Sequence, residues 1–435
     1  MRLALAALLA LSALPARAEI AIQAIDSPGG LRAWLVEDHT LPFVALELRF
    51  RGGSAVDPPA QRGAITLMTG LLEEGAAGLD AQGFTEAREA LAASFSFDVA
   101  DDALAVSAKF LTENRDASVE LLRKALIEPR FDQEAIDRVR GQVVSNIDYD
   151  AVDPGAIAGR EFDRQAYAGH PYASSNEGTK DSLAALTRAD LFAAKDRVMA
   201  RDRLYVAAVG DIDAAALGPL LDRLLGGLPE KGAGLPPRVP TSVTGGTSVI
   251  DFASPQTLVL FGQAGIARGA PDFFAAFLLN QILGGDGFSA RLMDEVREKR
   301  GLTYGISTWL LPMEFAEAWQ GSFSSSNGKV AEAIAVVRDE WAKAARDGVT
   351  EAELSAAKTY LTGAYPLRFD GNGPIAAILV GMQMQGLPID YAKTRNARVE
   401  AVTLADVNRV ARELMRPEGL RFVVVGQPEG VSGGD

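Results

Sequence analysis

A repeat with a period of about half the chain limits the folds that are open to this sequence. A helix start, a helix end and an apolar strand occur twice, at a constant offset of 216 residues and without a gap. Such a long-range match is hard to obtain by chance and indicates a duplicated α/β domain. The first copy consists of Thr187–Asp190, Val198–Met199 and Leu204–Gly210, and the second of Thr403–Asp406, Leu414–Met415 and Leu420–Gly426.

The two copies are separated by a segment that is rich in proline and glycine. Residues 229–246 are therefore predicted to be a linker between a first domain, residues 19–228, and a second domain, residues 247–435. Strand-like runs alternate irregularly with helical stretches, and hairpin-like pairs occur. This pattern favours an α+β fold of two homologous domains, each a mixed, mostly antiparallel sheet packed with helices.

Hydrophobic periodicity places the elements of the first half. Alternation predicts strands, and four stretches with helical spacing predict helices. Thr187 is expected to cap a further helix that precedes the strand Leu204–Gly210. The expected strands are Leu31–Glu37, Phe43–Phe50 and a hairpin over Phe95–Lys109, and the expected helices are 62–74, 85–93, 116–126 and 133–149.

The N-terminus has the pattern of a secretory signal. A short basic start precedes an apolar run and an Ala-Arg-Ala end, so residues 1–18 are predicted to be a signal peptide cleaved before Glu19. The apolar run is too short for a stable transmembrane helix, and no later run is as long. We therefore expect a protein without a membrane span, located in a bacterial periplasm.

Composition excludes several classes of function. Removal of the signal takes away two arginines and no acid, which leaves 41 basic and 57 acidic residues and a formal charge of −16. This charge disfavours nucleic acid and anionic membranes as partners. The chain has no cysteine, which excludes disulfides, thiol nucleophiles and thiolate metal sites.

Residues 284–307 contain a helix that leads into a turn. Phe288, Leu292 and Val296 recur every fourth residue, so one face of the helix should pack while the other faces outward. Gly301 is expected to end the helix, and Leu302–Ile306 has the composition of a strand.

Arg297 and Tyr304 are expected to lie close together in this stretch. The turn at Gly301 should bring Tyr304 near the C-terminal end of the helix that carries Arg297. The alternative is an ordinary surface helix with solvated pairs from Arg291 to Glu295 to Lys299, followed by a half-buried tyrosine in a strand.

Three features together resemble the family of pitrilysin, insulin-degrading enzyme and mitochondrial processing peptidase, the inverzincin zinc peptidases. The setting of Arg297 and Tyr304 is similar to the family's LREKRGLAY, and residues 170–182 resemble its HPY...GT..S segment. The duplicated architecture matches the family over the whole chain after residue 18. The resemblance implies that the arginine and the tyrosine reach across a closed chamber to a substrate held at zinc.

The chain departs from this family at every expected metal position. Active members bind zinc through H-x-x-E-H, whose histidines share one helical face, and through a glutamate on a later helix. Thr66, Thr69 and Gly70 stand at the positions of the first motif, and Ser145 and Asn146 replace two later glutamates. A neutral threonine is a poor zinc ligand and a poor base, and glycine has no side chain. We therefore expect this chain to bind no metal.

Other sites are weakly supported by the sequence. The two histidines, His39 and His170, are predicted to be structural or solvent-facing. Asp101–Asp102 and Glu73–Glu74 lack the spacing of a calcium loop and are expected to be a solvated turn and a helix end. No G-x-S-x-G motif occurs, and residues 284–287 lack the lysine of a phosphate-binding loop.

Two functional hypotheses remain, together with a third that the missing ligands disfavour. In the first, this chain is the non-catalytic subunit of a heteromeric periplasmic zinc peptidase. A homologous active chain would hold zinc, and this chain would offer Arg297 and Tyr304 to an unstructured peptide. In the second, the chain is a catalytically silent structural or peptide-binding homologue. The third, peptidase activity of the chain alone, would need an unorthodox metal site.

Overall fold

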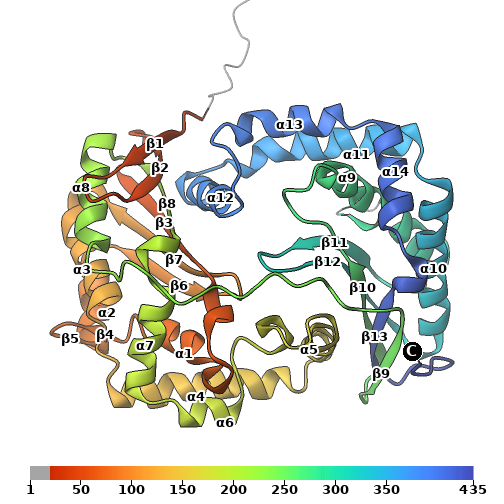
Figure 1. Cartoon of the computed structure of the whole chain (residues 1–435), viewed down its shortest axis with the longest axis horizontal. Coiled ribbons are helices and arrows are strands. Elements are labelled where there is room, and N and C mark those ends of the chain that lie inside the picture. Colours follow the sequence, from red (N-terminus) through yellow and green to blue (C-terminus); the bar gives the residue numbers. More distant parts are fainter. Residues whose placement is uncertain (1–19, 286, 288, 435) are drawn as a thin grey trace, which may run out of the picture.

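The computed structural model describes residues 20–285, 287 and 289–434. The predicted signal peptide, residues 1–18, lies outside the described residues. The described chain forms two halves, each built on one main sheet, and Figure 1 shows them side by side. No helix in the described part of the chain is long and apolar enough to span a membrane.

The main sheet of the first half has six strands in the order β1-β2-β8-β3-β7-β6. Neighbouring strands are antiparallel except for β2 and β8, which run parallel. A separate hairpin is formed by β4 (Gly75–Ala76) and β5 (Leu79–Asp80). The strands of the main sheet are β1 (Gln23–Asp26), β2 (Arg32–Glu37), β3 (Phe43–Arg51), β6 (Ser94–Val99), β7 (Ala103–Leu111) and β8 (Leu204–Gly210).

The sheet of the second half repeats this topology. Its order is β11-β12-β10-β13-β9, and all its neighbours are antiparallel except the parallel pair β13 and β9. The five strands correspond in chain order and direction to β2, β3, β6, β7 and β8. The duplicated, mostly antiparallel α+β architecture is therefore confirmed. The strands are β9 (Gly246–Asp251), β10 (Gln256–Ala264), β11 (Ile306–Pro312), β12 (Glu317–Ser326) and β13 (Arg421–Gly426).

Helices surround both sheets (Figure 1). Those of the first half are α1 (Ala64–Gly70), α2 (Ala81–Ala90), α3 (Arg115–Ile127), α4 (Gln133–Asp150), α5 (Pro154–Ala166), α6 (Lys180–Ala185), α7 (Arg188–Val198) and α8 (Ala214–Leu225). Those of the second half are α9 (Phe273–Gly284), α10 (Val330–Asp347), α11 (Glu351–Ala364), α12 (Asn372–Met384), α13 (Tyr391–Ala401) and α14 (Leu404–Leu414).

Two predicted helices have different limits in the structure. The helix expected over 62–74 is α1, which is shorter because the chain after Gly70 closes into tighter turns such as Leu72 N–H to Thr69 C=O (3.2 Å). The helix expected over 85–93 is α2, which begins earlier. Its cap is Asp80, whose side chain accepts a hydrogen bond from Gly83 N (2.8 Å).

The repeated helix starts form the same cap in both halves. Thr187 and Asp190 exchange side-chain and backbone hydrogen bonds at the start of α7, and Thr403 and Asp406 do so at the start of α14. Each pair satisfies two N–H groups that the helix itself leaves without a partner. The repeat in the sequence is thus a repeat of capping chemistry.

Each half covers a face of the other half's sheet with one helix. Figure 1 shows α5 against the strands of the second half and α12 against those of the first. Phe162 of α5 packs with Leu260 of β10 in one apolar cluster, and Leu379 of α12 packs with Ala45 of β3 in another. The two halves therefore complete each other's cores.

Strands β8 and β13 show why this exchange is necessary. Val206 and Ala208 of β8 are buried in the core of their own half, whereas Ala207 and Val209 face the cluster that contains α12. In β13, Phe422 and Val424 likewise face their own core, whereas Val423 and Val425 face α5. A strand that is apolar on both faces is stable only when both are covered.

A hydrogen-bonded junction connects the loop at residues 170–173 with the turn between β11 and β12. The Tyr172 hydroxyl donates to the Asp102 carboxylate and accepts a hydrogen bond from Phe315 N (3.1 Å). Asp102 also accepts from Glu314 N (2.9 Å). The expectation that Asp101–Asp102 is a solvated turn is therefore wrong at Asp102, because tertiary contacts bring the turn of the second half against it.

The segment predicted as a linker contains no helix or strand over residues 229–245. It is hydrogen-bonded to both halves: Ala233 N donates to Arg197 C=O (2.9 Å), and Val239 N donates to Phe315 C=O (2.8 Å). These contacts hold the segment along the junction of the two sheets.

The Tyr172 hydroxyl is expected to stabilise the junction measurably. Tyr172→Phe leaves a carboxylate oxygen of Asp102 and the N–H of Phe315 without their partner, and should lower the free energy of unfolding by about 1–3 kcal/mol. Urea titration followed by circular dichroism measures this loss. Tyr360→Phe, at an exposed tyrosine of α11, is the control. Equal effects of the two substitutions would contradict the assigned role.

A second prediction concerns Asp163 of α5, close to the same junction. Burial raises the pKa of its carboxyl to about 7, with a smaller contribution from the negative charge of Asp101. Because the folded pKa lies above the unfolded value, the stability contributed by the protonated carboxyl is complete below about pH 4 and is lost as pH rises through 7.

Asp163→Asn should therefore increase the free energy of unfolding at pH 8, by an amount on the order of 2 kcal/mol. The difference from the wild type should shrink toward zero near pH 4. Urea titrations at a series of pH values test this, with Glu89→Gln at an exposed carboxyl of α2 as the control. A difference that does not change with pH would show that the Asp163 carboxyl keeps its ordinary pKa.

Candidate functional site

Helix α1 carries three of the positions at which the sequence comparison expected zinc ligands. Its N-terminus is held by the buried Asp57, which accepts hydrogen bonds from Gly63 N (3.1 Å) and Ile65 N (3.2 Å). The Thr66 hydroxyl donates to Asn176 C=O (2.5 Å), and the Thr69 hydroxyl donates to Ile65 C=O (2.7 Å). Both hydroxyls are thus used within the fold.

Gly70 and helix α4 provide the remaining positions. A Cβ at Gly70 would lie 3.0 Å from Val139 Cγ1 of α4, so the two helices are close at this point. Ser145 and Asn146 are exposed, and the Ser145 hydroxyl donates to Gly141 C=O (2.9 Å) within the helix. Neither helix offers an ionised or imidazole side chain at the expected positions.

The loop at Asn176 and Glu177 connects the two helices. Asn176 accepts the hydrogen bond from Thr66 of α1, and the Glu177 carboxylate is hydrogen-bonded by the Asn146 side chain of α4. Burial raises the pKa of Glu177, and the bond from Asn146 opposes this shift. Across residues 20–434, apart from 286 and 288, no three His, Cys, Asp or Glu side chains are grouped closely enough to hold a metal ion.

The two histidines lie apart from these helices and from each other. His170 is buried, and its Nδ1 accepts a hydrogen bond from Tyr172 N (3.2 Å), so it shapes the loop at the junction. The His39 side chain is exposed, and its Nδ1 lies 2.6 Å from an Asp211 carboxylate oxygen, which raises the pKa of His39. Glu73 and Glu74 form ion pairs with Arg88 and Arg138.

The stretch that carries Arg297 folds as a π-helix, Met293–Glu298. Val296 is fully buried, as the periodicity predicted, and Phe288 lies outside the described residues. The helix ends at Glu298, three residues before the predicted Gly301. The chain then turns at Gly301, whose φ of +58° favours glycine, and Leu302 N donates back to Val296 C=O (2.9 Å).

Two predictions about this helix and the following strand are wrong. The strand expected from Leu302 starts at Ile306, as β11. The Thr303 hydroxyl donates to Ser324 C=O (2.7 Å) and accepts from Gly305 N (3.1 Å), which holds the chain in a bend before the strand. Arg291 does not pair with Glu295; its guanidinium binds the Glu353 carboxylate, because α11 packs beside it.

Tyr304 projects from this bend. Its side chain is 88% exposed, so the alternative of a half-buried tyrosine in a strand is also wrong. It lies between two hollows of about 440 and 470 Å³. Arg297, which forms an ion pair with Glu298 (3.3 Å), lines the second hollow together with Tyr304. The structure thus brings the predicted arginine and tyrosine to one hollow.

The hollows lie at one end of the second sheet, where residues of β10 and β12 line both of them and the start of β11 lines the first. Strand β11 is the first strand in the sheet order and pairs with β12 from Ile306↔Phe323 to Pro312↔Glu317. No described strand pairs with its other edge, so backbone groups of β11 are available to an extended peptide. This arrangement is chemically suited to hold a peptide backbone beside one exposed hydroxyl and one guanidinium.

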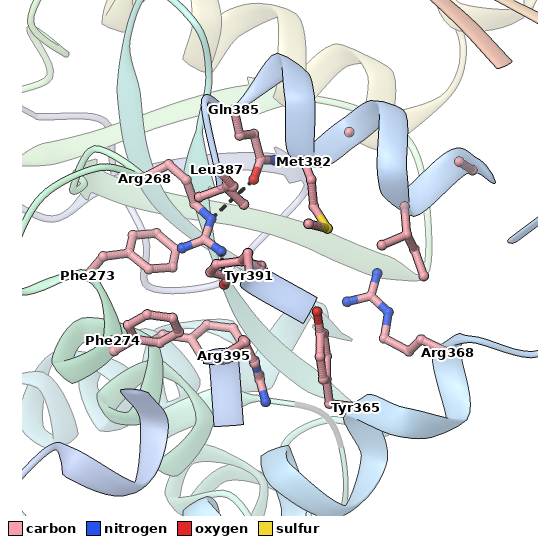
Figure 2. Close-up of a pocket in the computed structure, with 14 residues that line it drawn as sticks. Arg268, Phe273, Phe274, Tyr365, Arg368, Met382, Gln385, Leu387, Tyr391 and Arg395 are labelled. Carbon is pink, nitrogen blue, oxygen red and sulfur yellow. Dashed lines mark hydrogen bonds between the residues drawn. The ribbon is translucent and has the colours of Figure 1, made fainter. Parts of the chain in front are cut away.

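Sequence reasoning missed a further hollow of about 430 Å³ in the second half. Arg268, Arg368 and Arg395 line it together with aromatic side chains (Figure 2). Its residues come from α9, α12, α13 and three connecting segments. Because no two of the arginines share a motif, only the tertiary structure could reveal this site.

Comparison with known proteins places these observations in a family. Residues 32–180, which contain α1 and most of the loop that contacts it, match "Insulinase (Peptidase family M16)". Residues 185–361, which contain Arg297 and Tyr304, match "Peptidase M16 inactive domain". The chain belongs to peptidase family M16. This confirms the resemblance that the sequence motifs suggested.

Relatives in the M16 family match over nearly the whole chain. The "Non-peptidase homolog YmxG" of Helicobacter pylori is 27% identical over 393 residues, which cover 89% of this chain and 90% of the relative. An uncharacterised zinc protease of Mycobacterium tuberculosis is 27% identical over 400 residues, 89% of each chain. Both peptidase and non-peptidase names thus occur among the relatives.

Solved structures show the same fold. The crystal structure of a "peptidase M16 inactive domain" from Pseudomonas fluorescens superposes with a TM-score of 0.88 at 28% identity and covers 95% of this chain and 99% of that chain. A protease structure from Helicobacter pylori superposes with a TM-score of 0.84 at 18% identity and covers 94% and 100%.

Restoration of the family's ligands tests the assignment of the degenerate metal positions. The wild-type chain should show no saturable zinc binding by calorimetry. A variant with Thr66→His, Thr69→Glu, Gly70→His, Ser145→Glu and Asn146→Glu should bind zinc and gain stability with it, by about 2–3 kcal/mol when free zinc exceeds the dissociation constant a hundredfold.

The control carries only Ser145→Glu and Asn146→Glu, which add charge without histidines. It should bind zinc weakly or not at all. One equivalent of tightly bound zinc in the wild-type chain would show that the alignment of these positions is wrong.

Proposed function

We propose that this chain is the non-catalytic subunit of a heteromeric periplasmic zinc metallopeptidase. A homologous M16 chain that keeps H-x-x-E-H supplies the zinc, which activates water and polarises the scissile carbonyl. This chain closes the other side of the chamber and presents Arg297 and Tyr304 to the peptide. It contributes no metal ligand of its own.

The exposure of Tyr304 beside an unpaired strand edge is the observation that carries this proposal. A large aromatic side chain that is 88% exposed gains little stability for its own chain. Its hydroxyl can donate a hydrogen bond to the carbonyl oxygen that becomes negative when the peptide bond is attacked. Arg297 lines the same hollow, from which its guanidinium can reach a neighbouring carbonyl.

The edge of β11 supports a peptide substrate in an extended conformation. Addition of a strand to β11 would satisfy backbone groups of the peptide without selecting strongly for its side chains. Such recognition suits unstructured peptides, since a folded segment has no free backbone to offer. The hollows on either side of Tyr304 leave room for side chains of such a strand.

The proposal is also consistent with the side chains of α1 and α4, which offer neither zinc ligands nor a general base at the expected positions. Threonine hydroxyls bonded to carbonyl oxygens, and an amide bonded to Glu177, can neither ligate zinc tightly nor act as a general base. The relative named as a non-peptidase homologue and the solved structure named as an inactive domain are consistent with this chemistry.

The partner chain can be identified directly. Capture of the tagged chain from a periplasmic extract should bring with it a homologous chain that contains H-x-x-E-H. The purified pair should cleave an unstructured peptide, and removal of zinc should abolish the activity. Each chain alone should be at least about a hundredfold slower, because the donors and the zinc then lie on separate molecules.

In the reconstituted pair, Tyr304→Phe should lower kcat about a hundredfold and change KM less, since the hydroxyl acts as charge develops. Arg297→Ala should lower kcat/KM. Tyr360→Phe, at an exposed tyrosine on α11, serves as the control and should have no effect. Unchanged turnover with both Tyr304→Phe and Arg297→Ala would exclude the proposed role.

The second candidate function is a catalytically silent structural or peptide-binding homologue. It is favoured by the degenerate positions of α1 and α4 taken alone, and by the non-peptidase name of one relative. It predicts that no partner stimulates proteolysis and that substitution of Arg297 or Tyr304 alters no catalytic rate. The kinetics of the pair therefore distinguish the two functions.

A further inference from the structure

The hollow lined by Arg268, Arg368 and Arg395 has an unusual charge for this protein. Acidic residues outnumber basic ones 57 to 43 in the chain, yet no aspartate or glutamate lines this hollow. Among the described residues, none of the three guanidiniums forms an ion pair with a carboxylate. Arg409 nearby shows the usual arrangement, because it binds the Asp272 carboxylate through two hydrogen bonds.

Aromatic rings hold two of the three arginines in place. The Arg268 guanidinium lies 4.2 Å from the centre of the Phe273 ring and donates to the Tyr391 hydroxyl and to Gln385 Oε1 (3.2 Å). The Arg395 guanidinium lies 4.6 Å from the centre of the Tyr365 ring. Stacking orients a guanidinium without neutralising its charge, so the positive charge remains available to a ligand.

Arg395 is the least exposed of the three cations, at 6%. Its Nη1 donates to Leu361 C=O (2.7 Å) and to Asn396 Oδ1 (2.9 Å), whereas Nε and Nη2 form no hydrogen bond with described residues. Burial lowers the pKa of Arg395, and the charges of Arg268 and Arg368 act in the same direction. A buried cation without a counter-charge is costly, and an anion in the hollow would relieve that cost.

Tyr365 adds a neutral donor to the hollow. Its side chain is 9% exposed, and its hydroxyl forms no hydrogen bond with any described residue. Burial raises the pKa of Tyr365, so the hydroxyl stays protonated. In Figure 2 the hydroxyl of Tyr365 points toward the space between Arg368 and Met382.

The walls determine what kind of anion fits. Most of the remaining lining is apolar and includes Phe274, Phe277, Met382 and Leu387. A polyphosphate or nucleotide would bury several charges against these side chains, whereas a ligand with one carboxylate and an apolar body would bury only one. The volume of about 430 Å³ lies in the range of small-ligand pockets.

We propose that this pocket binds an amphipathic carboxylate, whose anionic group contacts the Arg368 guanidinium while its apolar body lies against the aromatic rings, and Arg268 and Arg395 add positive charge from other sides of the hollow. The ligand is about the size of one apolar amino-acid residue. It is either a free small carboxylic acid or the C-terminal residue of a peptide. The site shares no lining residue with the hollows beside Tyr304, so it is separate from the proposed peptidase function.

Binding to the isolated chain tests the proposal without any partner. N-acetyl-L-phenylalanine should bind saturably in a calorimetric or fluorescence titration, and its amide, which lacks the negative charge, should bind at least about tenfold more weakly. Equal affinity for acid and amide, or no saturable binding of either, would overturn the proposal. A failed peptidase assay would leave this measurement unaffected.

Substitutions locate the site. Arg368→Ala removes an exposed guanidinium and should weaken binding of the acid about tenfold, and Tyr365→Phe should weaken it less. Arg412→Ala, at an exposed arginine of α14, is the matched control and should leave the affinity unchanged. Thermal unfolding of each variant checks that the fold is intact. Equal affinity of Arg368→Ala and wild-type protein would place binding elsewhere and overturn the assignment.

A pair of peptides identifies the source of the carboxylate. The first peptide ends in phenylalanine, and the second is the same peptide with an amidated C-terminus. If the first binds more tightly than N-acetyl-L-phenylalanine and the second does not bind, the pocket recognises peptide C-termini. Tighter binding of the small acid would assign it to free carboxylic acids. Binding of the amidated peptide as tight as that of its acid would contradict recognition of a carboxylate.

Discussion

The exchange of helices α5 and α12 between the two halves is the packing interaction on which the rest of the structure depends. Strands β8 and β13 are apolar on both faces, and only one face of each is covered by its own half. Without the helix of the other half, the second face of each sheet would be open to water. The hydrophobic effect therefore favours the two halves together over either half alone. The hydrogen bonds of the Tyr172 hydroxyl with Asp102 and with Phe315 N fix the alignment of the two halves at their junction.

Local hydrogen bonds fix helices α1 and α4, at which the resemblance places the zinc ligands of active members. Where a structural ion supplies folding energy, loss of its ligands unfolds the domain. Here Thr66, Thr69 and Ser145 satisfy their hydroxyls on nearby carbonyl oxygens, and Asn146 is hydrogen-bonded to Glu177. Helices α1 and α4 consequently keep their places through local hydrogen bonds and the core beneath them. Of these positions, Thr69 is buried in the first half, whereas Ser145 and Asn146 are exposed on α4.

The second half combines two different recognition surfaces on one framework. The edge of β11 offers backbone groups beside Tyr304, whereas the arginine-lined pocket offers charge in apolar surroundings. The pocket is also backed by the contact between the halves, since Met382 and Tyr391 belong to the cluster that covers the first sheet.

The sequence by itself determined the duplication, the strands β2, β3, β6, β7 and β8 of the first half and the capped helix starts, because these depend on local periodicity and on side chains three residues apart. It also led to the prediction that the zinc-ligand positions are degenerate, since their spacing on α1 is local. It misplaced the ends of α1 and α2 and the start of β11, where hydrogen bonds from neighbouring segments decide. The sequence placed the apolar strands β8 and β13, but not the helices that cover their second faces. Only the tertiary structure decided that exchange, the burial of Asp102 and the meeting of three arginines in one pocket, because each joins residues that are far apart in the chain.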